Sequence, residues 1–475
     1  MFEDRSGRLP DRRPLKGYGA AVTAGPDGPL LFVGGYGTDN RVLTGGDDGL
    51  VDATPDPLSD PHGHAFGVVA ADVDADGDEE VYVHNSDAYG GISTERDRLF
   101  DRTATGWRDL FGLPVNAGRE NVRAGRSVAA VDRLGTGRYG LLLACYGAPM
   151  RFYELGDDGE VTDMAEDVGV DFLTGGRSLV AGPVVTDRTD VFVGNERGPN
   201  YLLRNDGGRF SDVAEAFGLG APGEHARGVA LVDPDGDGAF DLVVGNWEGP
   251  NRLFERRGGG GGDDGEGNGD TDADPTFVDV APAEWAEPTR TRTVLAADFD
   301  NDGAPEVFVN AMGAPNRLLR YRGGEWAVAD PGDAAEPRGL GTGATVCDVD
   351  GDGTLELLVV HGEIGSQPLS LYAAPNDNRW LRVRPLTEHG APARNAVVTL
   401  DTDRGTQTRL VDGGSGYLCQ TEPVAHFGLG GDTAAAAVPE EVRVRWPGGR
   451  ERGVDVSEEE AETELSVEHP ANRGA

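Results

Sequence analysis

Cysteine and long apolar runs are both scarce in this chain of 475 residues. The three cysteines, Cys145, Cys347 and Cys419, lie far apart and form no CxxC pair, which argues against a disulfide framework and a structural zinc site. No apolar stretch approaches the ~20 residues of a membrane span, so we expect none. Residues 1–5 carry no pattern of an export signal, which by sequence alone predicts a cytoplasmic location.

Positive charge is scarce too. Lysine and arginine together number 42, and only Lys16 is a lysine, against 83 aspartates and glutamates, so the net charge is -41. This excludes sequence-independent binding to nucleic acid, which needs a basic face to neutralise phosphates. Four divalent cations would offset only eight of these charges, so metal sites alone do not account for the acidity. We interpret the surface as adapted to concentrated salt, where dense carboxylates keep a protein hydrated.

Glycine and proline are abundant instead, at 74 and 29 residues, and both interrupt helices. A short apolar strand pattern recurs at a step of about 50 residues, as expected for a propeller or a solenoid. Helical periodicity is nowhere sustained, which excludes an α-solenoid. The pattern occupies residues 31–33, 81–83, 141–143, 191–193, 242–244, 307–309 and 357–359.

The pattern of each repeat predicts four short strands connected by turn-rich loops, which is the composition of one propeller blade. We therefore predict an all-β, seven-bladed β-propeller over residues 1–377, with a flexible acidic insertion at 258–275. The seventh repeat lacks an obvious fourth strand, and residues 2–5 match that strand's pattern. The N-terminal strand is thus expected to close the ring and protect a sheet edge.

The pattern changes after residue 377. Segments at 380–384, 396–400, 408–411 and 442–446 alternate apolar and polar residues like half-buried strands. Glycine-rich turns separate them at 413–416 and 447–449. Residues 378–470 are predicted to form a small β-sandwich-like domain.

Four repeats carry the same nonapeptide, D-x-D-x-D-G-x-x-[DE], between their first and second strands. Alternate carboxylates in a tight loop converge on one point, and a backbone carbonyl at position seven can add another oxygen. Calcium takes six to eight such hard oxygen ligands. The candidate metal residues are Asp72, Asp74, Asp76, Asp78 and Glu80; Asp233, Asp235, Asp237, Ala239 and Asp241; Asp298, Asp300, Asp302, Ala304 and Glu306; and Asp348, Asp350, Asp352, Thr354 and Glu356.

These loops predict about four Ca²⁺ sites. The alternative is a set of solvated acidic turns, but random acidity would not keep glycine at position six in four repeats. An EF-hand is rejected because strands, not helices, flank the loops, and Mg²⁺ is disfavoured because it prefers a strict octahedron with several waters.

A basic residue recurs just before the first strand of five repeats. Strand one is innermost in a blade, so these side chains should gather at one mouth of the central channel. Arginine binds carboxylate or sulfate bidentately, which suggests an anion site. The simpler interpretation is that each cation pairs with a carboxylate of a neighbouring blade and holds the blades together. The residues are Lys16, Arg126, Arg177, Arg227 and Arg292.

Taken together, residues 1–375 resemble the FG-GAP/VCBS repeats of integrin-like propellers. The segment from residue 378 resembles the ASPIC/UnbV domain through GGSGYLCQ at 413–420, HFGLG at 426–430 and VRVRWPGG at 442–449. The chain is thereby identified as similar to the cartilage acidic protein family. The resemblance implies calcium binding and, in many members, an extracellular location.

Catalytic motifs are not found: the sequence has no GxSxG elbow, HExxH pair, P-loop or dinucleotide fingerprint. We predict a non-catalytic, calcium-binding scaffold, monomeric, that binds an unknown protein or glycan. The alternative is a carbohydrate-active enzyme resembling a polysaccharide lyase and acting on acidic glycans. Such an enzyme needs a base near neutrality and cations facing the substrate carboxylate, and the sequence identifies no base.

Overall fold

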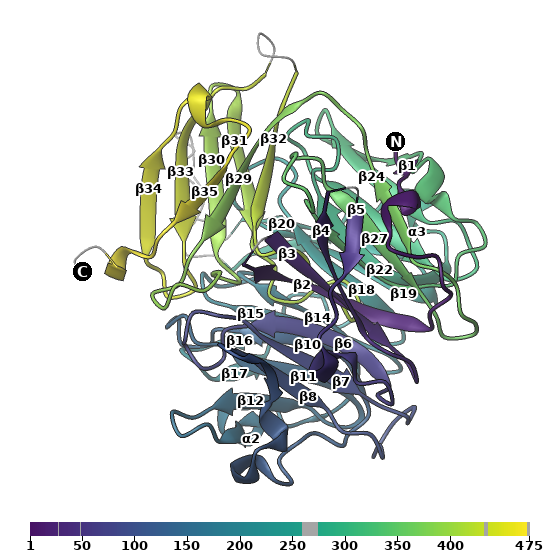
Figure 1. Cartoon of the computed structure of the whole chain (residues 1–475). Coiled ribbons are helices and arrows are strands. Elements are labelled where there is room, and N and C mark those ends of the chain that lie inside the picture. Colours follow the sequence, from purple (N-terminus) through teal and green to yellow (C-terminus); the bar gives the residue numbers. More distant parts are fainter. Residues whose placement is uncertain (27, 48, 259–273, 432–435, 473–475) are drawn as a thin grey trace.

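The computed structural model describes the chain except residues 27, 48, 259–273, 432–435 and 473–475, and most of its regular secondary structure is β-strand (Figure 1). The α-helices α1 (Asp56–Ser59), α2 (Ala165–Val168) and α3 (Ala283–Ala286) are single turns. No helix in the described part of the chain is long and apolar enough to cross a membrane. The predicted all-β class is confirmed, whereas the predicted insertion at 258–275 falls almost wholly outside the described residues.

The repeats fold as units of consecutive antiparallel strands. Two units are separate four-stranded sheets: β2 (Gly17–Gly25), β3 (Gly28–Gly35), β4 (Arg41–Gly46) and β5 (Gly49–Asp52); and β6 (Ala65–Ala71), β7 (Glu80–Asn85), β8 (Arg98–Thr103) and β9 (Gly106–Asp109). A further sheet combines β26 (Gly341–Cys347), β27 (Glu356–His361) and β28 (Ser370–Ala373) with the N-terminal β1 (Glu3–Asp4).

Two eight-stranded sheets each contain two such units, linked edge to edge. The first comprises β10 (Gly125–Val131), β11 (Gly140–Pro149), β12 (Arg151–Leu155), β13 (Val161–Asp163), β14 (Leu173–Gly182), β15 (Asp190–Asn195), β16 (Tyr201–Asn205) and β17 (Phe210–Asp212). The second comprises β18 (Ala226–Val232), β19 (Asp241–Gly249), β20 (Arg252–Arg257), β21 (Thr276–Asp279), β22 (Thr289–Ala297), β23 (Glu306–Ala311), β24 (Arg317–Arg322) and β25 (Glu325–Ala329).

The second strand of a unit is apolar on both faces because neighbouring units cover both. In β7, Val81 and Val83 pack in one cluster with Phe32 of the preceding unit. Tyr82, which points the other way, packs in a second cluster with Leu141 of the following unit. This explains why these strands read as continuous apolar runs instead of alternating.

The first strand of the chain joins the last repeat. In the antiparallel pairing of β1 with β28, Glu3 lies opposite Ala373 and Asp4 opposite Tyr372. Phe2 is buried, and its ring centroid lies 4.9 Å from that of Phe299. The N-terminal segment therefore contributes both backbone hydrogen bonds to the last sheet and a buried side chain to the core.

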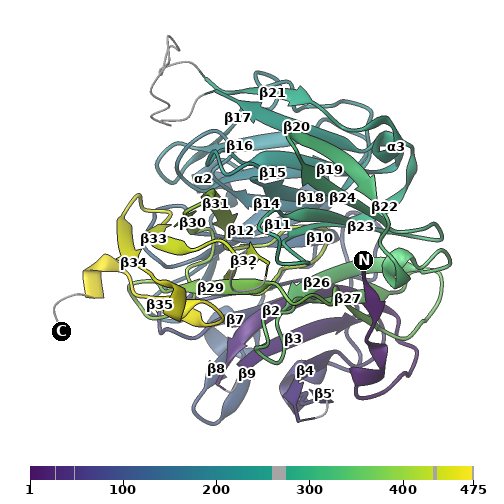
Figure 2. The ribbon, with the colours of Figure 1, turned by 90° about the horizontal axis from the view of Figure 1, so that it is seen from above.

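The C-terminal segment forms two sheets around a single core. One sheet is β32-β29-β35 and the other is β31-β30-β33-β34, and inward side chains such as Leu381, Val398, Phe427 and Val444 share one apolar cluster. In Figure 2 these sheets (yellow) lie between the purple and the teal repeat units. Their bounds are β29 (Arg379–Pro385), β30 (Val397–Thr402), β31 (Gly405–Leu410), β32 (Ala425–Gly430), β33 (Pro439–Arg445), β34 (Glu451–Asp455) and β35 (Glu464–Val467).

Residues 412–422 leave this domain and run between the first strands of the repeat units. The Ala130 N–H donates to the Gly413 carbonyl (2.6 Å), and the Val229 N–H donates to the Gly416 carbonyl (2.9 Å). The Gln420 side chain hydrogen-bonds both backbone groups of Ala70, at 2.7 and 3.0 Å. We call this segment the plug. The sequence identified its GGSGYLCQ motif but not its insertion.

Candidate functional site

The four predicted metal loops connect the first and second strands of their units, and each brings carboxylate oxygens together. In every loop, oxygens of three acidic side chains lie within 4.8 Å of one another. The sets are Asp72, Asp74 and Glu80; Asp233, Asp235 and Asp237; Asp298, Asp300 and Asp302; and Asp348, Asp350 and Glu356. Oxygen donors alone, at this spacing, fit a hard cation such as Ca²⁺.

The ends of the nonapeptide shape the loop. Asp72, at position one, accepts N–H groups from Ala75 (2.6 Å) and Gly77 (3.2 Å). Glu80, at position nine, accepts the N–H of Val73 (2.7 Å), and Glu306 and Glu356 repeat this bond. Positions one and nine thus fix the backbone of the loop. At position three, Asp300 pairs with Arg320 and Asp350 pairs with Arg8, whereas Asp235 is exposed.

One acidic neighbour was not predicted. Asp101, in β8, brings a carboxylate oxygen within 4.8 Å of those of Asp74 and Asp76. It is buried and pairs with Arg108 at 2.5 Å. Its strand is separated from the loop by β7, so the nonapeptide spacing could not reveal it.

Burial makes these carboxyl groups hard to ionise without a cation. It raises the pKa of Asp72 to about 7, of Asp241 to about 8 and of Glu306 to about 9. A divalent cation among them would favour the ionised forms.

The C-terminal domain packs directly on two of the loops. The Gly428 N–H donates to Asp298 (2.9 Å), and Arg382 lies 3.2 Å from Asp348. His426 Nε2 lies 2.6 Å from the Asn301 side-chain oxygen, and burial holds the pKa of His426 well below its usual value. The loops therefore also form a domain interface.

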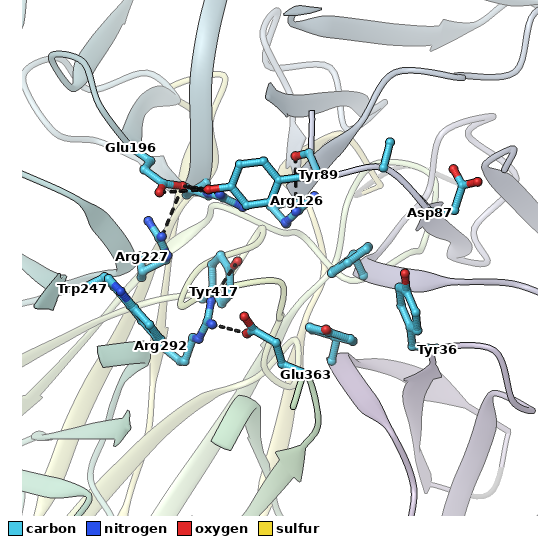
Figure 3. A pocket seen from close by; sticks show the side chains of 14 residues that line it. Tyr36, Asp87, Tyr89, Arg126, Glu196, Arg227, Trp247, Arg292, Glu363 and Tyr417 are labelled. Atoms are coloured by element: carbon cyan, nitrogen blue, oxygen red, sulfur yellow. Dashed lines mark hydrogen bonds and ion pairs between the residues drawn. The ribbon is translucent and has the colours of Figure 1, made fainter. Parts of the chain in front are cut away.

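A second candidate site lies at the N-terminal ends of the first strands of the repeat units. The metal loops follow the opposite, C-terminal ends of these strands. Arg126, Arg177, Arg227 and Arg292 converge on one pocket of about 340 Å³ (Figure 3). Lys16, the fifth predicted cation, is not among the residues that line this pocket, although its ammonium group lies 4.4 Å from the ring centroid of Tyr36, which does line it. The remaining lining residues are Tyr18, Tyr36, Phe66, Asp87, Ala88, Tyr89, Glu196, Trp247, Glu363 and Tyr417.

Carboxylates compensate only part of this charge. Arg177 and Arg227 share Glu196, the latter at 3.2 Å, and Arg292 pairs with Glu363. In the part of the chain that the structure describes, Arg126 makes no ion pair, and its guanidinium stacks 4.3 Å above the Phe66 ring. The four arginines thus share one pocket and three of them are paired with carboxylates, while the anion site stays a prediction.

The plug supplies Tyr417, which with Tyr18 is one of two buried phenols among the residues that line the pocket. Tyr417 is 2% exposed, and Arg292 Nη1 lies 3.4 Å from its hydroxyl. Burial alone would raise the pKa of Tyr417, but Arg292, Arg177, Arg126 and Arg227 together lower it. Burial also lowers the pKa of Arg227, to about 10, with Arg177 adding to the effect. The lowering of the Tyr417 pKa by four arginines is the effect expected of an electropositive pocket.

Both the repeat region and the C-terminal domain match known protein families. Residues 387–473 match the family model "ASPIC and UnbV", and residues 187–244, 233–309 and 298–359 match "FG-GAP-like repeat". Cartilage acidic protein 1 of Mus musculus is 40% identical over 95% of this chain and 74% of its own length. The human protein is equally identical, with 72% of its length covered.

Among solved structures, the BP39L lectin from Burkholderia pseudomallei aligns with a TM-score of 0.48 and 14% identity. That alignment covers 76% of this chain and 99% of the lectin. The SapL1 lectin, solved with alpha methyl fucoside, aligns with a TM-score of 0.39 and 11% identity, covering 66% of this chain and 95% of the lectin.

Proposed function

Since the chain belongs to the cartilage acidic protein family, we propose that it is a non-catalytic, calcium-stabilised scaffold that binds a protein or a glycan. The observation that carries this proposal is the convergence of carboxylates in four loops that recur in phase with the repeat. Ca²⁺ would be held by the side chains at positions one, three, five and nine, with the carbonyl of position seven available. Bound Ca²⁺ would supply positive charge that offsets repulsion within each loop.

The scaffold itself we propose to be a closed seven-bladed propeller. Repeats of four strands, covered on both faces by their neighbours, support this architecture. The pairing of β1 with β28 supports closure by the N-terminal strand, which removes an exposed sheet edge. The plug fills the space between the first strands and would make the centre a solid core instead of an open channel.

The calcium proposal is tested by metal analysis and by melting in Ca²⁺ and in chelator, both at high salt. We expect bound calcium and a higher melting temperature in Ca²⁺, because a ligand that binds only the folded state stabilises it. Asp235→Asn should reduce the shift, and Asp157→Asn, an exposed aspartate (93%) outside the loops, should not. No bound calcium and equal melting temperatures would reject the proposal.

A second candidate function is elimination on acidic glycans, and one observation favours it. Tyr417, with its lowered pKa, stands among arginines that could face a substrate carboxylate. A phenolate there would take the proton next to that carboxylate, the bond to the leaving sugar oxygen would break, and that oxygen would take up a proton. Ultraviolet absorbance of unsaturated product from polygalacturonate would establish this activity. If no such product forms after long incubation, the scaffold function remains the proposal.

A further inference from the structure

We infer that the arginine pocket binds an acidic saccharide, with Arg126 as the anchor for its carboxylate or sulfate group. The inference deepens the proposed scaffold function, on which it rests, by naming the chemistry of the ligand. Three features of the pocket lead to it: uncompensated positive charge, buried donors without partners, and aromatic faces.

The guanidinium groups of the pocket outnumber its carboxylates, so an anion can bind there without excess negative charge. Four guanidinium groups face Glu196 and Glu363, while the third acid of the pocket, Asp87, is exposed and occupied by Ser93 and Thr94. Arg126 is 5% exposed, and a buried charge of this kind is costly unless an opposite charge compensates it. A bound carboxylate or sulfate beside Arg126 would supply that charge.

Buried hydrogen-bond donors point the same way. The Nε atoms of Arg227 and Arg292 are buried and have no hydrogen-bond partner in the described structure. Among the described residues, the Arg126 guanidinium donates hydrogen bonds to two backbone carbonyls, those of Gly125 and, at 3.5 Å, Tyr89. Buried polar groups normally find partners, so donors left over at a pocket indicate a missing acceptor.

The aromatic lining favours a sugar over a simple polyanion. The side chains of Tyr36, Phe66, Tyr89 and Trp247 line the pocket, and the exposed Tyr89 ring offers a surface on which the apolar C–H face of a sugar can pack. Glu196 and Glu363 would repel a polyphosphate but can accept hydroxyl hydrogen bonds. One anionic group with several hydroxyls, in a volume of about 340 Å³, matches a uronate or a sulfated sugar.

The test is calorimetric titration of the full chain in Ca²⁺ at constant salt. Tetragalacturonate carries carboxylates only and a sulfated, uronate-free carrageenan tetrasaccharide carries sulfates only, so the pair distinguishes the two anions, with maltotetraose as the neutral control. We expect binding of at least one acidic probe and none of maltotetraose. Arg126→Gln should weaken binding at least about ten-fold, as expected for the loss of a charged hydrogen bond. Arg204→Gln, an exposed arginine paired with Asp206, should leave it unchanged.

Tyr89→Ala provides a second route, because this ring is 57% exposed and its removal should leave the fold intact. It should weaken the same titration. The melting shift in Ca²⁺ is recorded on every variant, so that folding and calcium binding are judged separately. The inference is overturned if neither acidic probe binds while the calcium shift is present, or if binding survives both substitutions unchanged.

Discussion

Aspartates at the first position of the loops have a role that does not depend on metal. Asp132 lies in a repeat without the nonapeptide, yet it accepts N–H groups from Gly135 (2.7 Å), Thr136 (3.0 Å) and Gly137 (2.7 Å). The complete loops use the same bonds at Asp72 and Asp233. The first aspartate is therefore a turn-forming residue throughout, and metal specificity rests on the later positions.

This distinction gives a prediction. Asp132→Ala should lower the free energy of unfolding by about 2 kcal/mol in Ca²⁺ and in chelator alike, because three part-buried N–H groups lose their acceptor. Asp235→Ala, at an exposed position three, should lower it in Ca²⁺ and barely change it in chelator. Urea unfolding under both conditions measures the difference. Equal calcium dependence of the two variants would contradict the assignment.

Glu196 gives a pH prediction at the same scale. Burial would raise its pKa, but Arg177 and Arg227 overcome this and lower it to about 2. A lowered carboxyl pKa contributes stability that is present above the unfolded value, about 4.5, and is lost as the pH falls towards 2. The stability difference between the wild type and Glu196→Gln should thus be constant above pH ~5 and shrink below it. Parallel urea curves at several pH values measure it, and a difference that grows on acidification would refute the pairing.

The N-terminal strand is an element whose importance exceeds its length. β1 has two residues, but it pairs with β28, and Phe2 before it packs on Phe299 and Phe308 of the neighbouring unit. Deleting residues 1–5 should cost about 3–5 kcal/mol, the range for loss of a buried phenylalanine, and expose an unpaired edge. Thermal or urea unfolding measures this. Phe2→Ala separates the core contribution from the pairing, and a truncated chain as stable as the full one would show that β1 is a frayed end.

The plug is the element that relates the two domains. It contacts repeat units on different sides of the centre through Ala130, Val229 and Ala70, and its tip places Tyr417 in the arginine pocket. The C-terminal domain also packs on the loops at Asp298 and Asp348. The C-terminal domain therefore contacts the metal loops through its strands and the arginine pocket through the plug.

For the whole molecule, net charge governs behaviour in dilute solution. At -41, repulsion between surface carboxylates opposes the compact state, and salt screens it over about 10 Å at 0.1 M. We predict that dialysis into dilute, calcium-containing buffer unfolds the protein and that added KCl restores it. Circular dichroism follows both steps. A spectrum unchanged in dilute buffer would remove the evidence for salt adaptation.

Much of this protein follows from local sequence. The repeat, the four acidic loops and the row of arginines are each encoded within a few residues of one strand, and a strand fixes its side-chain directions through its own pleat. The all-β class and the gathering of Arg126, Arg177, Arg227 and Arg292 at one place could therefore be predicted.

Tertiary structure alone decided which groups meet. Glu196 bridges two arginines of successive units, Asp101 approaches the loop of Asp74 from another strand, and Tyr417 reaches Arg292 across 125 residues of chain. The contacts between the plug and the repeat units follow no periodic pattern in the sequence, because they depend on how the C-terminal domain docks on the repeats. Periodicity encodes neighbours within a unit, whereas contacts between units and domains arise only when the chain closes on itself.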